Sequence, residues 1–201
     1  MRIGIIGTGN IATGLAGRLV KAGHQVMFGS RSASKAQEAA RRYGAQGGTQ
    51  AEAVEFGDVI FLAIPFTSVQ GLRQSLPGLR GKVVVETTND WMGQSKQSTT
   101  AQIQSWLPDS KVVKAFNYTF AQILAHDMAK DVERPSAFIA GNDGGAKKSA
   151  AQVIESIGFD VVDVGSADDA IHLDHLVKFV VHLGTEKGYG TSAAFKLIKV
   201  Y

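Results

Sequence analysis

The feature that most constrains the fold is a glycine-rich turn close to residue 1. A short apolar run, Arg2–Ile6, leads directly into Gly7-Thr8-Gly9-Asn10-Ile11-Ala12, which has the spacing G-x-G-x-x-A. After the turn, apolar residues recur at helical spacing from Ile11 to Ala22, and Gly23 follows as a helix C-cap. The sequence therefore predicts a strand, a tight turn and a helix, which together begin a parallel α/β sheet.

Each small residue of this turn has a physical task in holding a pyrophosphate. Gly7 permits the tight turn, Gly9 lets the backbone approach the phosphates, and Ala12 lets the helix and the strand pack closely. The free N–H groups at the start of the helix face the bound anion. We therefore predict a dinucleotide site made by Gly7, Thr8, Gly9, Asn10 and Ile11.

The end of the second predicted strand indicates which dinucleotide binds. NAD-binding proteins usually carry Asp or Glu roughly 20 residues after the glycines, where it accepts hydrogen bonds from the ribose. This chain has Phe28-Gly29-Ser30-Arg31 there, so no carboxylate repels a 2′-phosphate. Ser30 can donate a hydrogen bond to that phosphate, Arg31 can pair with it, and Lys35 can add a second cation. This favours NADP; the alternative is that Arg31 and Lys35 are solvent-facing charges of an ordinary loop.

The hydrophobic pattern of the rest of the chain predicts an α/β protein with a doubly wound Rossmann fold and a mainly parallel sheet of about eight strands. The first six strands form the doubly wound part, and the last two extend its edge. The strands are expected at Arg2–Ile6, Gln25–Phe28, near Ala45, Asp58–Ala63, Lys82–Glu86, Lys111–Ala115, Ser136–Ala140 and Asp160–Val164.

Helices are predicted between these strands and after the last one. Ser34–Tyr43 and Ala146–Ile157 are each followed by a glycine that can end a helix. After Gly165 no further strand is expected, and two short C-terminal helices follow, Asp168–Leu183 and Ser192–Val200. We interpret residues 1–201 as a single NADP-binding domain, with residues 166–201 as a C-terminal helical extension.

The composition excludes several classes of function. With 21 basic and 18 acidic residues the formal charge is +3, and no basic run is dense enough for nucleic acid. The chain has no cysteine, which excludes disulfides and thiolate metal sites. The longest uncharged apolar stretch, Val59–Phe66, is too short to cross a membrane, and no signal peptide is recognisable. We therefore expect a cytoplasmic protein.

Two further loops are placed at the carboxyl edge of the predicted sheet, where ligands of such folds bind. Ala63, Ile64 and Pro65 follow the fourth strand, and Asn89 follows the fifth. We predict that all four contact the dinucleotide and that Asn89 reaches the nicotinamide amide. The alternative for Asn89 is that it caps a turn.

The chain resembles the coenzyme F420-dependent NADP oxidoreductase family. The resemblance is carried by the glycine turn, by Gly29-Ser30-Arg31, by Lys114-Ala115-Phe116-Asn117 and by Phe195-Lys196-Leu197. The same domain type is similar to the cytosolic part of transmembrane metalloreductases. The resemblance implies a homodimer in which a hydride passes between NADPH and a deazaflavin (F420) or flavin ring, a small-molecule acceptor that the C-terminal helices help to enclose.

On that resemblance Ala115, Asn117 and Tyr118 line the acceptor site, and no catalytic acid or base is needed because the cofactor supplies the reactivity. The position of Asn117 carries histidine in the better assigned deazaflavin reductases. Asn117 has two open interpretations: it hydrogen-bonds a flavin carbonyl, or it caps the short helix that begins near Phe120. The acceptor itself stays open among deazaflavin, FMN, FAD, a quinone and a small carbonyl compound.

The residues give less support to other functions and sites. His172, His175 and His182 fall on one helix face, where packing or a dimer contact is favoured over a metal site. No tyrosine has a lysine four positions later, which argues against a short-chain dehydrogenase. The competing class is a non-enzymatic sensor of NADP(H) that acts through a protein partner, because a fold alone does not establish catalysis.

Overall fold

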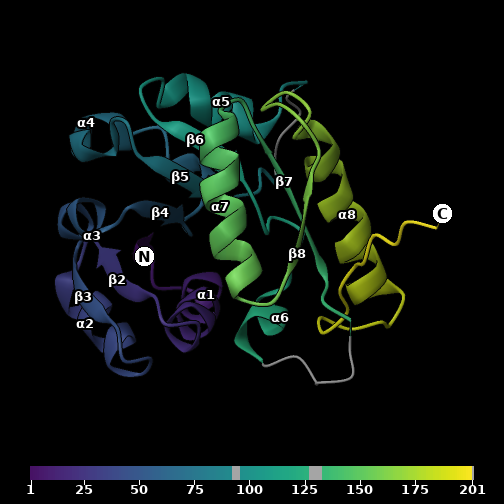
Figure 1. The fold of residues 1–201 in the computed structure, drawn as a ribbon, viewed down its shortest axis with the longest axis horizontal. Coiled ribbons are helices and arrows are strands. Elements are labelled where there is room, and N and C mark those ends of the chain that lie inside the picture. Colours follow the sequence, from purple (N-terminus) through teal and green to yellow (C-terminus); the bar gives the residue numbers. More distant parts are fainter. Residues whose placement is uncertain (92–95, 127–132, 201) are drawn as a thin grey trace.

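The computed structural model describes residues 1–91, 96–126 and 133–200. Eight strands form one sheet in the order β3-β2-β1-β4-β5-β6-β7-β8 (Figure 1). All neighbouring pairs are parallel except β6 and β7, which are antiparallel. The strands are β1 (Arg2–Ile6), β2 (Gln25–Ser30), β3 (Gln46–Thr49), β4 (Val59–Leu62), β5 (Val83–Glu86), β6 (Lys111–Lys114), β7 (Ser136–Gly141) and β8 (Asp160–Asp163).

This topology confirms the predicted α/β, doubly wound Rossmann fold. The chain runs outward from β1 to β3, returns to β4 on the other side of β1, and continues outward to β6. The switch point of the sheet therefore lies between β1 and β4. Strands β7 and β8 extend the edge beyond β6, as the pattern predicts. Ligands of doubly wound sheets bind at the carboxyl ends of the strands beside this switch point.

Helices cover both faces of the sheet. They are α1 (Asn10–Lys21), α2 (Ala33–Arg41), α3 (Gln50–Phe56), α4 (Leu72–Ser75), α5 (Thr99–Trp106), α6 (Ala121–Ala125), α7 (Gly144–Ser156) and α8 (Ile171–Glu186), with 3-10 turns at Phe66–Ser68 and Pro77–Leu79. Helices α1, α2 and α7 share one core cluster with the sheet, whereas α3 and α5 contribute to a second cluster on the opposite face. The central strand β4 is buried at all four positions because it is covered on both sides.

Helix α8 occupies the face of β7 opposite α7. Ala137 and Ile139 belong to the core cluster that includes α7, whereas Phe138 and Ala140 pack with residues of α8. Successive side chains of a strand point to opposite faces, so β7 serves both helices. Figure 1 shows α7 lying across the near face of the sheet. This arrangement brings α8 to the carboxyl end of β6.

The second predicted C-terminal helix, Ser192–Val200, is wrong. These residues carry no helix, and their backbone instead meets the start of β7. The Ser136 N–H donates to the Phe195 carbonyl (2.8 Å), and the Leu197 N–H donates to Ser136 Oγ (2.9 Å). Backbone groups used in this way cannot form the i to i−4 ladder of a helix. The described part of the C-terminal extension therefore contains one helix, α8.

No helix within residues 1–91, 96–126 and 133–200 combines the length and the apolar character that crossing a membrane requires.

Candidate functional site

The glycine turn lies between β1 and α1. Gly7 has φ +124°, and a Cβ built there would lie 2.2 Å from the Ala63 carbonyl oxygen at the end of β4. Only glycine fits this position without displacing the backbone. Gly9 is the N-cap of α1, and a Cβ built on it would meet no described atom within 4 Å. The space in front of Gly9 and the first N–H groups of α1 is therefore open to a ligand.

Ser30, Arg31 and Lys35 gather where β2 leads into α2. Ser30 is partly buried at the end of β2, and its Oγ accepts a hydrogen bond from the Ser32 N–H (3.3 Å). Arg31 and Lys35 are exposed, and neither forms an ion pair with a described residue. Ser32 is the N-cap of α2, and its side chain makes no capping hydrogen bond to the helix N–H groups. Two unpaired cations beside the start of a helix suit an anion such as a 2′-phosphate.

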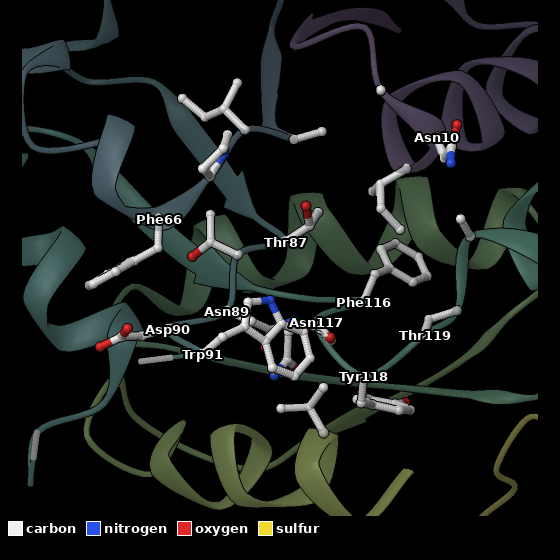
Figure 2. A pocket seen from close by; sticks show the side chains of 18 of the residues that line it. Asn10, Phe66, Thr87, Asn89, Asp90, Trp91, Phe116, Asn117, Tyr118 and Thr119 are labelled. Atoms are coloured by element: carbon white, nitrogen blue, oxygen red, sulfur yellow. Dashed lines mark hydrogen bonds between the residues drawn. The ribbon is translucent and has the colours of Figure 1, made fainter. Parts of the chain in front are cut away.

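A cavity of about 620 Å³ continues from the glycine turn along the carboxyl ends of the strands (Figure 2). It is of a size that ordinarily takes a small-molecule ligand or cofactor. Its wall is made by the start of α1, by the loops after β4, β5 and β6, and by α8. The lining includes Gly9, Asn10, Ile11, Ala63, Ile64, Pro65, Phe66, Thr67, Thr87, Thr88, Asn89, Asp90, Trp91, Phe116, Asn117, Tyr118, Thr119, Phe120, Ala121, Val177 and Val181.

Asn89 and Asn117 hold the loops after β5 and β6 together. Asn89 Nδ2 donates to the Asn117 backbone carbonyl (2.7 Å), and Asn117 Nδ2 donates to Asn89 Oδ1 (3.1 Å). Asn117 Nδ2 also donates to the Leu173 carbonyl of α8 (3.0 Å). Asn89 therefore bonds across the sheet edge instead of capping a local turn. The helix-cap interpretation of Asn117 is wrong, because the N-cap of α6 is Phe120.

Ala115 and Tyr118 differ in their relation to the cavity. Ala115 is fully buried in the core and does not line the cavity. Tyr118 lines it, but its hydroxyl donates to the Ser136 carbonyl (2.6 Å) and accepts from the Phe138 N–H (3.1 Å), both in β7. Burial raises the pKa of the Tyr118 hydroxyl well above its usual range. This hydroxyl is a structural contact and is not available as a proton donor to a ligand.

Phe116 joins β6 to the cavity in a strained conformation. Its φ is +62°, which no other described non-glycine residue approaches. The residue is 1% exposed, and its ring packs edge-on against Phe159, with the ring centroids 5.0 Å apart. A left-handed bulky residue persists only where its surroundings fix it. The turn at Phe116 directs the next residue, Asn117, into the space between the β5 loop and α8.

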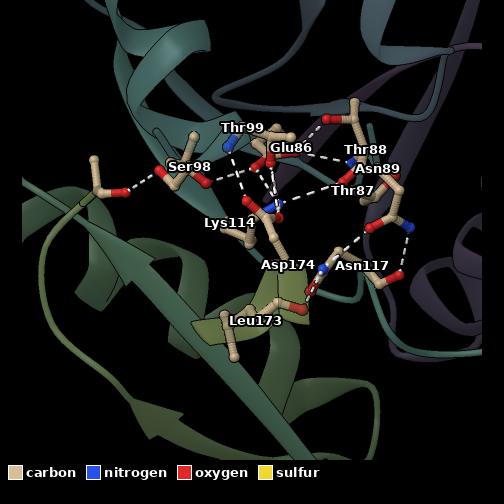
Figure 3. Close-up of polar contacts among 12 residues, drawn as sticks. Glu86, Thr87, Thr88, Asn89, Ser98, Thr99, Lys114, Asn117, Leu173 and Asp174 are labelled. Carbon is tan, nitrogen blue, oxygen red and sulfur yellow. Dashed lines mark hydrogen bonds and ion pairs between the residues drawn. The ribbon is translucent and has the colours of Figure 1, made fainter. Parts of the chain in front are cut away.

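A buried ionic cluster lies behind the β5 loop (Figure 3). Lys114 Nζ lies 2.8 Å from Glu86 Oε1 and 3.2 Å from Asp174 Oδ1, and Lys114 and Glu86 are completely buried. Glu86 also accepts from the Thr88 N–H (2.8 Å), and Asp174 accepts from the Thr99 N–H (2.8 Å). Because Asp174 belongs to α8, the cluster ties that helix to β5, β6 and α5. It fixes one wall of the cavity.

Residues 2–90 match the model of the family described as NADP oxidoreductase, coenzyme F420-dependent. Over these residues the chain is similar to this family. The chain is also similar to the F420-dependent NADP reductase of Methanothermobacter marburgensis, which is 28% identical over 91% of this chain and 92% of its own length. The match confirms the predicted family of NADP-dependent oxidoreductases, and the strand, turn and helix that carry the glycine motif lie within the matched residues.

The chain is also similar to larger proteins. Metalloreductase STEAP3 of Rattus norvegicus is 33% identical over 84% of this chain but only 35% of its own length. The chain thus spans about a third of the metalloreductases it matches. Among solved structures, a hypothetical protein from Sinorhizobium meliloti is 28% identical with a TM-score of 0.76, over 85% of this chain and 87% of that one. A protein of Arthrobacter sp. FB24, 24% identical, shares the fold at a TM-score of 0.86 over 98% of this chain and 99% of that one.

The structure thus brings together most, but not all, of the predicted site. Asn10, Ile11, Ala63, Ile64, Pro65, Asn89, Asn117 and Tyr118 line one cavity with Gly9. Gly7 and Thr8 form the turn beneath it, and Ala115 is in the core. Ser30 and Arg31 lie at the end of β2, and Lys35 lies in the first turn of α2. The sequence analysis did not name the aromatic wall at Phe66, Trp91 and Phe116. The family resemblance implied that C-terminal helices help to enclose the acceptor, but it did not name the α8 residues that line the cavity, Val177 and Val181.

The histidines of α8 show no metal site. Within the described parts of the chain, no group of three His, Asp or Glu side chains is placed to hold a metal ion. His182 Nδ1 lies 2.8 Å from Glu186 Oε2, one helical turn later, whereas His172 and His175 are exposed. These side chains therefore belong to the outer surface of α8.

Proposed function

We propose that this chain transfers a hydride between NADPH and a deazaflavin or flavin-type acceptor. The observation that carries the proposal is the continuity of the cavity: it begins at the glycine turn and ends between aromatic and aliphatic side chains of the β6 loop and α8. A hydride passes directly from one ring to another only when both are held face to face in one water-poor space. One cavity that takes both rings meets this requirement.

The residues fit NADP(H) in extended form. The open space at Gly9 admits the pyrophosphate against the first N–H groups of α1, and a side chain at Gly9 would occupy that space. Ser30, Arg31 and Lys35 would hold the 2′-phosphate. The loop at Ala63, Ile64 and Pro65 would then run along the ribose toward Asn89. When bound, NADPH supplies the hydride; the chain supplies the position and the face of the ring.

The acceptor would occupy the far end of the cavity. Phe116 and Asn117 of the β6 loop and Val177 of α8 form the inner wall there, and Trp91 lies at the rim with 62% of its surface exposed. Figure 2 shows the Trp91 ring projecting into the pocket in front of Asn117. Apolar and aromatic walls with few polar groups suit a flat conjugated ring. No acid or base is required, since ring positioning accounts for the reaction.

The test is NADPH oxidation by the purified protein with F420, FMN, FAD, a quinone and simple aldehydes as acceptors, and NADH as the control donor. The proposal predicts turnover with NADPH and a tricyclic acceptor, and little with NADH or aldehydes. Tight NADPH binding without turnover on any acceptor would favour the alternative, a redox sensor that acts through a partner protein. The homodimer implied by the family resemblance stays a prediction, which light scattering of the same sample measures.

A further inference from the structure

In the Asn117 side-chain amide, the donor group Nδ2 has hydrogen-bond partners and the acceptor Oδ1 has none among the described residues. Both Nδ2 hydrogens have acceptors, at Asn89 Oδ1 (3.1 Å) and at the Leu173 carbonyl (3.0 Å). Oδ1 is buried and accepts no hydrogen bond within the part of the chain that the structure describes. Asn117 as a whole is 4% exposed and lines the cavity. A buried acceptor left without a donor costs about 1–3 kcal/mol, so native proteins rarely keep one without a reason.

The surrounding contacts fix which way the amide points. Reversing it would place the amide oxygen against two acceptors, Asn89 Oδ1 and the Leu173 carbonyl. Reversing Asn89 as well would break the bond from Asn89 Nδ2 to the Asn117 carbonyl (2.7 Å). Figure 3 shows the two side chains meeting between the β5 loop and α8. The group that Asn117 has left to offer a ligand is therefore an acceptor, Oδ1.

We infer that Asn117 Oδ1 is a specificity-determining acceptor for an amide-type N–H of a bound ligand. This inference rests on the proposed function, and it excludes the expectation that Asn117 donates to a flavin carbonyl, because no Nδ2 hydrogen is left for that bond. Two groups in the proposed reaction carry such an N–H at the edge of a flat ring. One is the carboxamide of the nicotinamide, and the other is the ring imide of a flavin or deazaflavin.

The binding partner is identified by removing the N–H from each ligand in turn. The first arm compares NADP⁺ with its 3-acetylpyridine analogue, which keeps the carbonyl group and lacks the amide N–H. The second arm compares FMN with N3-methyl-FMN in the presence of saturating NADP⁺. Dissociation constants are measured by calorimetry on the wild-type chain, on Asn117→Leu and on the control Tyr118→Phe. The control removes a neighbouring hydroxyl that bonds to β7 and leaves both Nδ2 contacts of Asn117 in place.

In one arm the wild-type chain is expected to bind the N–H ligand about 5- to 10-fold more tightly than its analogue. Asn117→Leu should bring that ratio close to 1, whereas Tyr118→Phe should keep the ratio. The ligand pair whose affinity ratio falls in Asn117→Leu identifies the N–H group that Asn117 Oδ1 binds. A purely structural role would change both affinities and leave every ratio as in the wild type.

Equal wild-type affinities within both pairs would overturn the inference even if Asn117→Leu failed to fold, because the wild-type ratios alone decide it. The inference would also fail if the Asn117→Leu ratios matched those of the wild type. If the wild-type chain binds NADP⁺ but does not distinguish the N–H ligands from their analogues, only the role of Asn117 is refuted. If it does not bind NADP⁺ at all, the proposed function is refuted as well.

Discussion

Two alanine substitutions in the glycine turn should have opposite consequences, although they are only two residues apart. At Gly7 the added Cβ would lie 2.2 Å from the Ala63 carbonyl oxygen, and φ is +124°. The unfavourable backbone conformation costs about 1–3 kcal/mol, and relieving the overlap costs about 1–3 kcal/mol more. Gly7→Ala should therefore destabilise the fold by about 2–6 kcal/mol, which lowers Tm on the order of 10 °C for a chain of this length.

At Gly9 the added Cβ would meet no described atom within 4 Å, and φ is −80°, which alanine adopts freely. Alanine is a poorer N-cap than glycine, so Gly9→Ala should cost no more than about 1 kcal/mol of stability. The methyl group would, however, stand in the space assigned to the pyrophosphate. We expect NADP⁺ affinity to fall by at least about tenfold, or about 1.4 kcal/mol.

Differential scanning fluorimetry and NADP⁺ titration of the two variants separate these effects. The expected result is a large loss of Tm for Gly7→Ala and a large loss of affinity at nearly unchanged Tm for Gly9→Ala. Wild-type affinity in Gly9→Ala would refute the close approach of the pyrophosphate to this turn. An unchanged Tm in Gly7→Ala would refute the packing of Gly7 against the end of β4.

Three further substitutions test other parts of the account. Arg31→Glu should weaken NADP⁺ binding by on the order of 100-fold in titrations, since it replaces a cation by a carboxylate beside the 2′-phosphate, whereas Arg41→Glu at the other end of α2 should not; equal effects would contradict the assignment. Lys114→Met leaves the carboxylates of Glu86 and Asp174 facing each other without a cation, and chemical denaturation should show a loss of about 3–5 kcal/mol. Because the pKa of Tyr118 is raised in the folded state, its contribution to stability is complete below pH 10 and declines as the pH rises above that value. In thermal melts Tyr118→Phe should therefore lose less stability than the wild type above pH 10. An equal loss in the two proteins would contradict this.

The fold could be predicted because its signals are local. Strands of a covered parallel sheet are short apolar runs, and glycines mark the ends of α1, α2 and α7. One local signal was available and overlooked: Thr49 and Glu52 form a capping box that begins α3. The C-terminal segment was predicted wrongly because its apolar residues fit a helical pattern, whereas the partner that decides its path, Ser136, lies far away in the sequence.

The candidate site could be predicted only where the backbone determines it. The glycine turn carries its own geometry, so its place between β1 and α1 follows from the sequence. The Asn89–Asn117 pair and the burial of Lys114 do not, because each joins side chains from separate loops and from α8. Ala115 was predicted to line the acceptor site because it lies in the motif that suggests that site. Side chains along an extended strand alternate between its two faces, and this alternation directs Ala115 into the core.

The central claim is direct hydride transfer in one cavity, and isotope transfer tests it most directly. NADPH carrying deuterium at C4, prepared separately in each of its two stereochemical forms, is oxidised by the protein with a 5-deazaflavin, whose reduced C5 position does not exchange with water. The account predicts that one of the two forms delivers its deuterium to C5 of the acceptor, as seen by mass spectrometry. Reduced acceptor without deuterium from either form, or no reduced acceptor at all, would contradict the account.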